Sequence, residues 1–223
     1  MANNPHSRDL IFSPIIRICH WLRALAIVLL VISGFYLSWP FLVQYGGTDN
    51  LMQGWVRFGH LVAGFALCAI TLARFYLYFF GKSDIERRSF KDAISPKAWI
   101  ENLKAYMYMG HMHKSGVYGP LQYVTYIGLT LVIVVMCITG LILHAHVYHE
   151  GIGGAFMPIA EALIPMFGTL AFVRELHHFL TWFFVIFVVI HVYMAVFSGI
   201  RFKHNSVDSI VSGYDYHPMK DKH

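Results

Sequence analysis

Four histidines lie in segments apolar enough to cross a membrane: His20, His60, His191 and one of the neighbours His177 and His178. An imidazole is costly to bury in hydrocarbon unless its nitrogens are hydrogen-bonded or bound to a metal. Histidine is also the commonest metal ligand among the side chains. The depth and spacing of these residues therefore decide between isolated hydrogen-bonded groups and a metal-binding arrangement.

The elements that must position these histidines are four apolar runs, at about 15–42, 58–80, 121–145 and 178–200. Each reaches the roughly 20 residues that a helix needs to cross the hydrocarbon layer. The chain is 57% hydrophobic and 13% charged, whereas soluble domains carry about 25% charged residues. We therefore expect an all-α integral membrane protein whose residues 1–223 form one domain, a four-transmembrane-helix bundle.

Lysine and arginine placement predicts the orientation of the bundle. The N-terminal segment, the 81–118 loop and the 201–223 tail hold 14 basic residues. The other side, which includes the 146–176 loop, holds only Arg57 and Arg174, both near span ends. Both termini are thus predicted to face the cytoplasm. The net charge of +5 reflects this topology and contact with anionic lipid, with no indication of nucleic-acid binding.

With this orientation the histidines fall at two depths. His60 and His177 lie near the outer surface, and His20 and His191 lie closer to the cytoplasm. Fourteen residues separate His177 from His191, which is about 21 Å of helix with the side chains within roughly 40° of one face. Two imidazoles facing across a bundle suit six-coordinate haem iron, so the pattern predicts two b-type haems enclosed by the bundle.

Two alternatives remain open from spacing alone. His178 lies 13 residues before His191 and about 140° from its direction, so helical periodicity favours His177, while the adjacent imidazole stays open as an alternative ligand. A histidine in a membrane can also simply bond a neighbouring helix, as in a transporter or scaffold without redox chemistry. Four histidines at two matched depths favour haem.

The haems are expected to be non-covalent and closely enclosed. No Cys-x-x-Cys-His motif occurs among the three cysteines, which argues against covalent attachment. Gly34, Gly64 and Gly140 could let the edge of a macrocycle approach the backbone, although small residues equally serve helix packing.

Arginines near the span ends are suited to haem propionates. Arg74, with Arg17 or Arg23, is placed for the inner haem, because a charge inside a span is costly without a partner. Arg57 and Arg174 are the outer equivalents. Each of these side chains could instead extend to the membrane interface.

Three motifs surround the histidines. They read Arg17-Ile-Cys-His20-Trp21 with Ser33-Gly34, Arg57-Phe-Gly-His60 with Ala73-Arg-Phe-Tyr76, and His177-His178 with Trp182, Phe187 and His191-Val-Tyr-Met194. Together with the tail element Ser209-Ile-Val-Ser-Gly-Tyr214, they resemble the dihaem cytochrome b subunit of membrane-bound nickel–iron (uptake) hydrogenases, over about residues 8–217. Ser33 stands where the family pattern has Thr. Glu175 and Phe179 also depart from the pattern, and these departures leave the ligands untouched.

The resemblance implies a role and a ligand set. It favours His177 over His178 as ligand, giving an outer haem at His60/His177 and an inner haem at His20/His191. It implies a subunit of the bacterial cytoplasmic (inner) membrane that takes electrons from the small (iron–sulfur) and large (nickel–iron) hydrogenase subunits in the periplasm and passes them to quinone. The chain would perform no hydrogen chemistry itself.

The quinone site and the partner are the less specific parts of the resemblance. Quinone contacts are expected from His113, Ser115 and Tyr118, although this chain has Tyr118-Gly-Pro120 where the family often has His-Asn-Pro. The nearest rival is the cytochrome b subunit of a respiratory formate dehydrogenase, which would use the same haems with another periplasmic enzyme. The residues present at Arg17–Trp21 and His191–Met194 favour the hydrogenase subunit over the formate dehydrogenase subunit.

Overall fold

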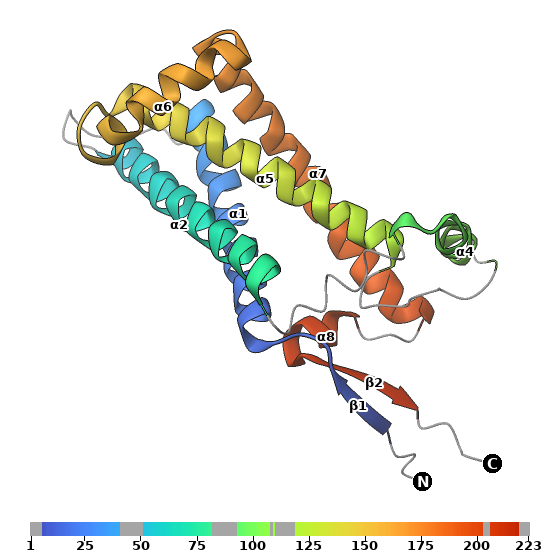
Figure 1. Ribbon diagram of the computed structural model, residues 1–223. Coiled ribbons are helices and arrows are strands. Elements are labelled where there is room, and N and C mark those ends of the chain that lie inside the picture. The colour runs from blue at the N-terminus through green and yellow to red at the C-terminus, as the bar shows by residue number, and fades with distance from the viewer. Residues whose placement is uncertain are drawn as a thin grey trace, which may run out of the picture. The chain divides into compact units, whose positions relative to one another are not determined.

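The structure, a computed structural model, describes residues 6–40, 51–81, 93–107, 109, 119–202 and 206–218. Four helices in these ranges are long and apolar enough to cross a membrane. They are α1 (Pro14–Ser38), α2 (Met52–Phe80), α5 (Pro120–Val147) and α7 (Leu170–Phe202) (Figure 1). The predicted helical membrane fold with four spans is confirmed.

The helix ends differ from the predicted span ends where local backbone chemistry outweighs hydropathy. α1 starts at Pro14 and α5 at Pro120, because proline suits the first helical turn, where its missing N–H would have no partner. α1 stops at Ser38 and not at 42, because Pro40 disfavours helical backbone in the residue before it. α2 and α7 start six and eight residues before the apolar runs, because a helix can continue into the polar interface.

The segments predicted as loops and tail also contain regular structure. Ser95 Oγ accepts a hydrogen bond from the Ala98 amide and so caps α4. The shorter elements are β1 (His6–Leu10), α4 (Pro96–Tyr106), α6 (Gly151–Phe167), α8 (Ser206–Ser212) and β2 (Tyr214–Pro218).

The chain forms two compact units, and each spanning helix contributes residues to both. The first unit comprises Met1–Trp21, Arg74–Gly128 and Val189–His223, and the second comprises Leu22–Ala73 and Leu129–Val188. His20 and His191 therefore belong to the first unit, and His60 and His177 belong to the second.

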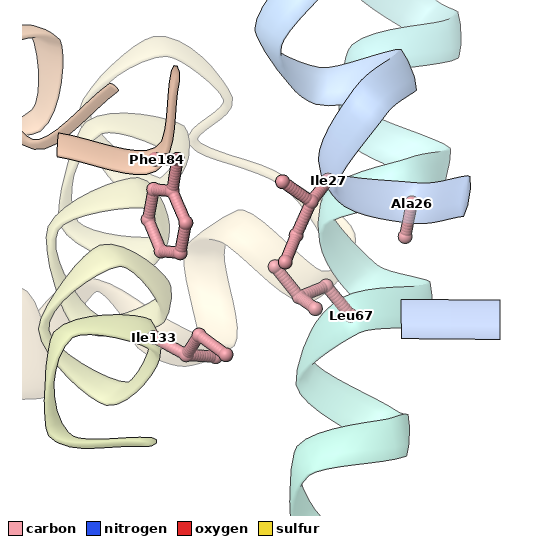
Figure 2. Packing of buried hydrophobic residues seen from close by; sticks show 5 residues of the cluster. All are labelled: Ala26, Ile27, Leu67, Ile133 and Phe184. Atoms are coloured by element: carbon pink, nitrogen blue, oxygen red, sulfur yellow. The ribbon is translucent and has the colours of Figure 1, made fainter. Parts of the chain in front are cut away.

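All four spanning helices contribute to the core of the second unit. Figure 2 shows the buried residues of this core, which are Ala26 and Ile27 from α1, Leu67 from α2, Ile133 from α5 and Phe184 from α7. Ile133 is 0% and Phe184 is 3% exposed. Because lipid tails are as apolar as these side chains, close packing holds such helices together.

The helix α6 packs against α5 and α7 within the second unit (Figure 1). Its buried Ala160 belongs to a cluster with Ile142 and Ala145 of α5 and Val173 of α7. Gly168, with a φ of 90°, ends α6, since only glycine adopts this left-handed backbone without strain. The predicted outer loop is thus a packed helical hairpin.

The two ends of the chain pair in the first unit. β1 and β2 form an antiparallel ribbon in which His6 pairs with Pro218 and Leu10 with Tyr214 (Figure 1). Directly after β1 and directly before β2, the chain is joined again, because the Gly213 carbonyl accepts hydrogen bonds from the amides of Ile11 and Phe12 at 2.8 and 3.1 Å.

An arginine locks this junction. The Arg17 guanidinium donates from Nη1 to the Val211 carbonyl at the end of α8 at 2.5 Å. Gly213 has a φ of 91°, and a Cβ there would lie 2.8 Å from the Phe12 carbonyl oxygen and 3.2 Å from Arg17 Nε. We call this arrangement of Arg17, Val211 and Gly213 the tail clasp.

A substitution at Gly213 tests the tail clasp. Gly213→Ala should loosen the ribbon by about 1–3 kcal/mol, because alanine is strained at this φ and its methyl group meets backbone. We expect faster amide hydrogen exchange in residues 6–10 and 214–218. Gly128→Ala is the matched control, since a Cβ there meets nothing within 4 Å. Equal exchange in the two variants would contradict the structural role of Gly213.

Candidate functional site

Two histidines face each other in the second unit. His60 of α2 and His177 of α7 have ring centroids 6.5 Å apart and an angle of 66° between their planes. Both side chains are half-buried. The structure therefore brings together the two residues expected at the outer level.

The other two spanning helices hold these rings through hydroxyl groups. Ser33 Oγ of α1 lies 2.8 Å from His60 Nδ1, and Thr139 Oγ1 of α5 lies 2.8 Å from His177 Nδ1. All four helices thus take part in positioning the pair. Ser33 was predicted only as a motif residue, and Thr139 was not predicted.

A cavity of about 290 Å³ adjoins the pair, lined mostly by apolar side chains of the second unit. His60, His177, Gly34, Gly64 and Gly140 are among its walls. A Cβ on Gly34 or Gly140 would lie 3.4 Å from the ring Cε1 of His60 or His177, respectively. These glycines therefore let the imidazoles approach the neighbouring helix backbones.

Basic side chains also line this cavity. Arg57 and Arg174, both predicted as propionate contacts, are joined by His144. The His144 ring packs edge-on against Phe65 at 5.2 Å, and its Nδ1 is buried without a hydrogen-bond partner among the described residues. His144 had not been predicted at this cavity. Its position four residues after Gly140, and so on the same helix face, was the signal that could have found it.

The neighbouring His178 has a different environment. It is exposed, its Nδ1 lies 3.2 Å from Ser38 Oγ, and its ring packs edge-on against Phe35 at 6.0 Å. Of the two adjacent histidines, the structure brings His177 to His60.

The first unit contains the second facing pair. His20 of α1 and His191 of α7 have ring centroids 6.2 Å apart and an interplanar angle of 50°. Trp21, the last residue of the first motif, packs edge-on against His20 at 5.4 Å. The two residues expected at the inner level thus also lie together.

A buried arginine lies in the same unit. Arg74 is 6% exposed, and its Nη2 donates to the Tyr126 hydroxyl at 3.0 Å. About one turn from Arg74 on α2 and from Tyr126 on α5, the hydroxyls of Tyr78 and Tyr123 lie 2.9 Å apart. These tyrosines had not been predicted. A guanidinium buried beside a neutral hydroxyl is well suited to receive an anion.

Of the remaining predicted residues, Arg17 and Arg23 lie in the part of the chain that the structure describes. Arg17 takes part in the tail clasp, and Arg23 belongs to the second unit and not to the unit of Arg74. His113, Ser115 and Tyr118 lie outside the described residues.

The donor sets constrain which metal chemistry is possible. Among the described residues, no three His, Cys, Asp or Glu side chains come close enough to hold a metal ion together. Two imidazoles alone are a poor site for a bare ion, which takes four or more ligands. Two imidazoles suit a metal ion that another group already holds and that needs only two further ligands.

Comparison with known proteins agrees with this chemistry. Residues 11–213 match the family described as "Prokaryotic cytochrome b561", and the chain therefore belongs to this family. Similar proteins are named as probable Ni/Fe-hydrogenase B-type cytochrome subunits. One from Azotobacter chroococcum mcd 1 is 31% identical over 208 residues, covering 89% of this chain and 85% of that protein.

Two further relatives have related names. The probable Ni/Fe-hydrogenase B-type cytochrome subunit of Cupriavidus necator is 30% identical over 214 residues, covering 89% of this chain and 83% of that protein. The probable Ni/Fe-hydrogenase 1 B-type cytochrome subunit of Escherichia coli (strain K12) is 25% identical over 213 residues, covering 93% and 90%. The resemblance drawn from the motifs is confirmed.

The family implies b-type haem, and the residues present fit it. A nitrogen ligand lies about 2 Å from a bound metal, so two imidazoles on opposite sides of one haem iron have ring centres roughly 6 Å apart. The observed separations are 6.2 and 6.5 Å. The apolar cavity with a basic edge beside His60 and His177 fits the macrocycle and its propionates.

The close approach at Gly140 can be tested by filling it. Gly140→Leu should push the His177 ring away from His60, because a Cβ at this position already lies 3.4 Å from Cε1 of the ring and leucine adds three more carbon atoms. Haem retained per purified chain should fall. Gly59→Leu is the control, since a Cβ there meets nothing within 4 Å although it directly precedes His60. Undiminished haem in the Gly140 variant would show that the backbone approach is dispensable.

Proposed function

We propose that this chain anchors a periplasmic nickel–iron hydrogenase to the membrane and passes its electrons through two bis-histidine haems b to the quinone pool. The observation that carries the proposal is the presence of two facing histidine pairs, 6.2 and 6.5 Å between ring centres, in a chain of a cytochrome b family. Membership of the family supports haem, and the pairs support its number and ligation.

The ligand set favours electron transfer over substrate binding. A haem held by two histidines would supply a one-electron carrier, because the protein's imidazoles would take the positions that a substrate would otherwise occupy. His60 and His177 would ligate one haem and His20 and His191 the other. The apolar lining of the cavity would exclude water around the first of these pairs.

Anion-binding residues support the same reading. Arg57, Arg174 and His144 would bind the propionates of the haem at His60 and His177, since all three line that cavity. Arg74, held by Tyr126, would serve the haem at His20 and His191. The Nη1 of Arg17 donates to Val211, so we assign Arg17 chiefly to the tail clasp.

The orientation and partner follow from charge and similarity. The excess of lysine and arginine in the N-terminal segment, the 81–118 loop and the tail supports cytoplasmic termini. The pairing of β1 with β2 supports placing both termini on one side of the membrane. The hydrogenase names of the relatives support a hydrogenase as the periplasmic partner of the opposite surface.

Quinone reduction would occur near the haem of His20 and His191. His113, Ser115 and Tyr118 are the proposed contacts, because they precede the third span on the predicted cytoplasmic side. Protons taken up there from the cytoplasm would make the overall reaction separate charge across the membrane.

Single ligand substitutions should remove one haem at a time. His177→Ala or His60→Ala should leave one haem b per chain, and His20→Ala or His191→Ala should remove the other, as measured by pyridine haemochrome and redox titration. His178→Ala is the matched control and should keep two. A His177 variant with both haems, or a His178 variant with one, would reverse the ligand assignment. A wild-type chain without a b-type spectrum would overturn the proposal itself.

The physiological partner can be identified by gentle solubilisation. We expect a nickel-containing enzyme to co-purify with the chain and to reduce quinone with hydrogen. Loss of either haem should abolish quinone reduction and leave reduction of an artificial dye by the hydrogenase largely intact, because the dye takes electrons directly from the enzyme. Co-purification of a molybdenum or tungsten enzyme would instead indicate a formate dehydrogenase.

A further inference from the structure

The two histidines of the second unit are held in the same way by different helices. Ser33 Oγ lies 2.8 Å from His60 Nδ1 and also donates to the Leu29 carbonyl of its own helix at 2.6 Å. Thr139 Oγ1 lies 2.8 Å from His177 Nδ1 and donates to the Val135 carbonyl at 2.9 Å. Each hydroxyl therefore lies between a carbonyl one turn earlier and an imidazole on another helix.

This arrangement determines where the imidazole proton is. A hydroxyl group has one proton to donate and two lone pairs that accept. Because the carbonyl can only accept, the proton of each hydroxyl is used on its own helix. The Nδ1 of His60 and of His177 must then donate to the oxygen, and Nε2 of each ring is left with a free lone pair, the form that ligates a metal.

A glycine follows each hydroxyl residue and makes room for the same ring. A Cβ on Gly34 would lie 3.4 Å from Cε1 of His60, and one on Gly140 would lie 3.4 Å from Cε1 of His177. The dipeptides Ser33-Gly34 and Thr139-Gly140 thus do two things for one imidazole each. The first residue bonds Nδ1, and the second lets the ring lie against the helix.

We infer that Ser33-Gly34 of α1 and Thr139-Gly140 of α5 are a repeated histidine cradle, whose hydroxyls are positioning residues for the haem ligands His60 and His177. The inference rests on the proposed function and deepens it. A ligand histidine that donates its second N–H is fixed in tautomer and ring orientation and becomes more basic. A more basic ligand stabilises ferric iron more than ferrous iron, so the hydroxyls should lower the potential of this haem.

A hydroxyl in a membrane helix can also bond only its own backbone, and the chain offers such a case as a control. Thr71 Oγ1 of α2 donates to the Leu67 carbonyl at 2.7 Å, and Thr71 is 4% exposed. Like Thr139, Thr71 is buried and donates to the carbonyl four residues earlier in its own helix. Thr71→Val therefore measures the effect of removing a buried hydroxyl that bonds its own helix and not an imidazole.

The test compares removal and retention of each hydroxyl in the full-length chain purified with its haem. Thr139→Val replaces the hydroxyl by a methyl group of similar size, and Ser33→Ala removes it. Either change should weaken binding of one haem by about 10- to 100-fold and raise its midpoint potential. Thr139→Ser and Ser33→Thr keep the hydroxyl and should restore wild-type affinity and potential, and Thr71→Val should resemble wild type.

Haem content, redox titration and the low-temperature paramagnetic resonance of the ferric haems provide the readouts, and thermal unfolding in detergent checks that each variant is folded. A wild-type chain with two haems, together with Thr139→Val and Ser33→Ala variants of unchanged affinity and potential, would overturn the cradle alone. The same shift in Thr71→Val would also overturn it, because the effect would then be general. A wild-type chain that binds no haem would overturn the proposed function.

Discussion

An imidazole inside a membrane needs a partner for each ring nitrogen, and this requirement organises the part of the protein built around His60 and His177. One nitrogen of each ring bonds a hydroxyl on another helix, and the centroids of the two rings lie 6.5 Å apart. Since a hydroxyl and an imidazole can meet across two helices only when their backbones approach closely, a glycine follows the hydroxyl residue in both cases. The hydrogen bonds and the close helix packing around these two rings thus both follow from the cost of leaving an imidazole nitrogen without a partner in the membrane.

The two units contain a histidine pair each, together with different polar groups. The second unit has hydroxyl-bonded histidines beside a cavity with a basic edge. The first unit contains Arg74 and Tyr126, together with the tail clasp near the start of α1. Arg17 is three residues before His20 and so lies about one turn from it on α1. The C-terminal segment is therefore fastened to the same helical turn that carries a proposed ligand.

The sequence predicted the four spans and both histidine pairs because hydropathy and helical rise are local properties that convert directly into depth. It favoured His177 over His178 without deciding between them, because helical periodicity gives directions but does not show the contacts of His178 with Ser38 and Phe35. His144 was not predicted at the cavity, although the span expected at 121–145 contains it, because hydropathy does not show which side chains near a span end line a cavity. Thr139 was missed because periodicity says nothing about which hydroxyl meets which ring. The ribbon was missed because pairing between the two ends of a chain leaves no local pattern.

That ribbon has a consequence for the order in which the protein is made. β1 ends at Leu10, whereas its partner strand begins at Tyr214, so synthesis of the intervening chain at about 5–20 residues per second delays their pairing by roughly 10–40 s. During that interval the first turn of α1 lacks the tail clasp. The first turn of α1, which carries Arg17 one turn before His20, therefore gains these contacts only after Val211 and Gly213 have been synthesised.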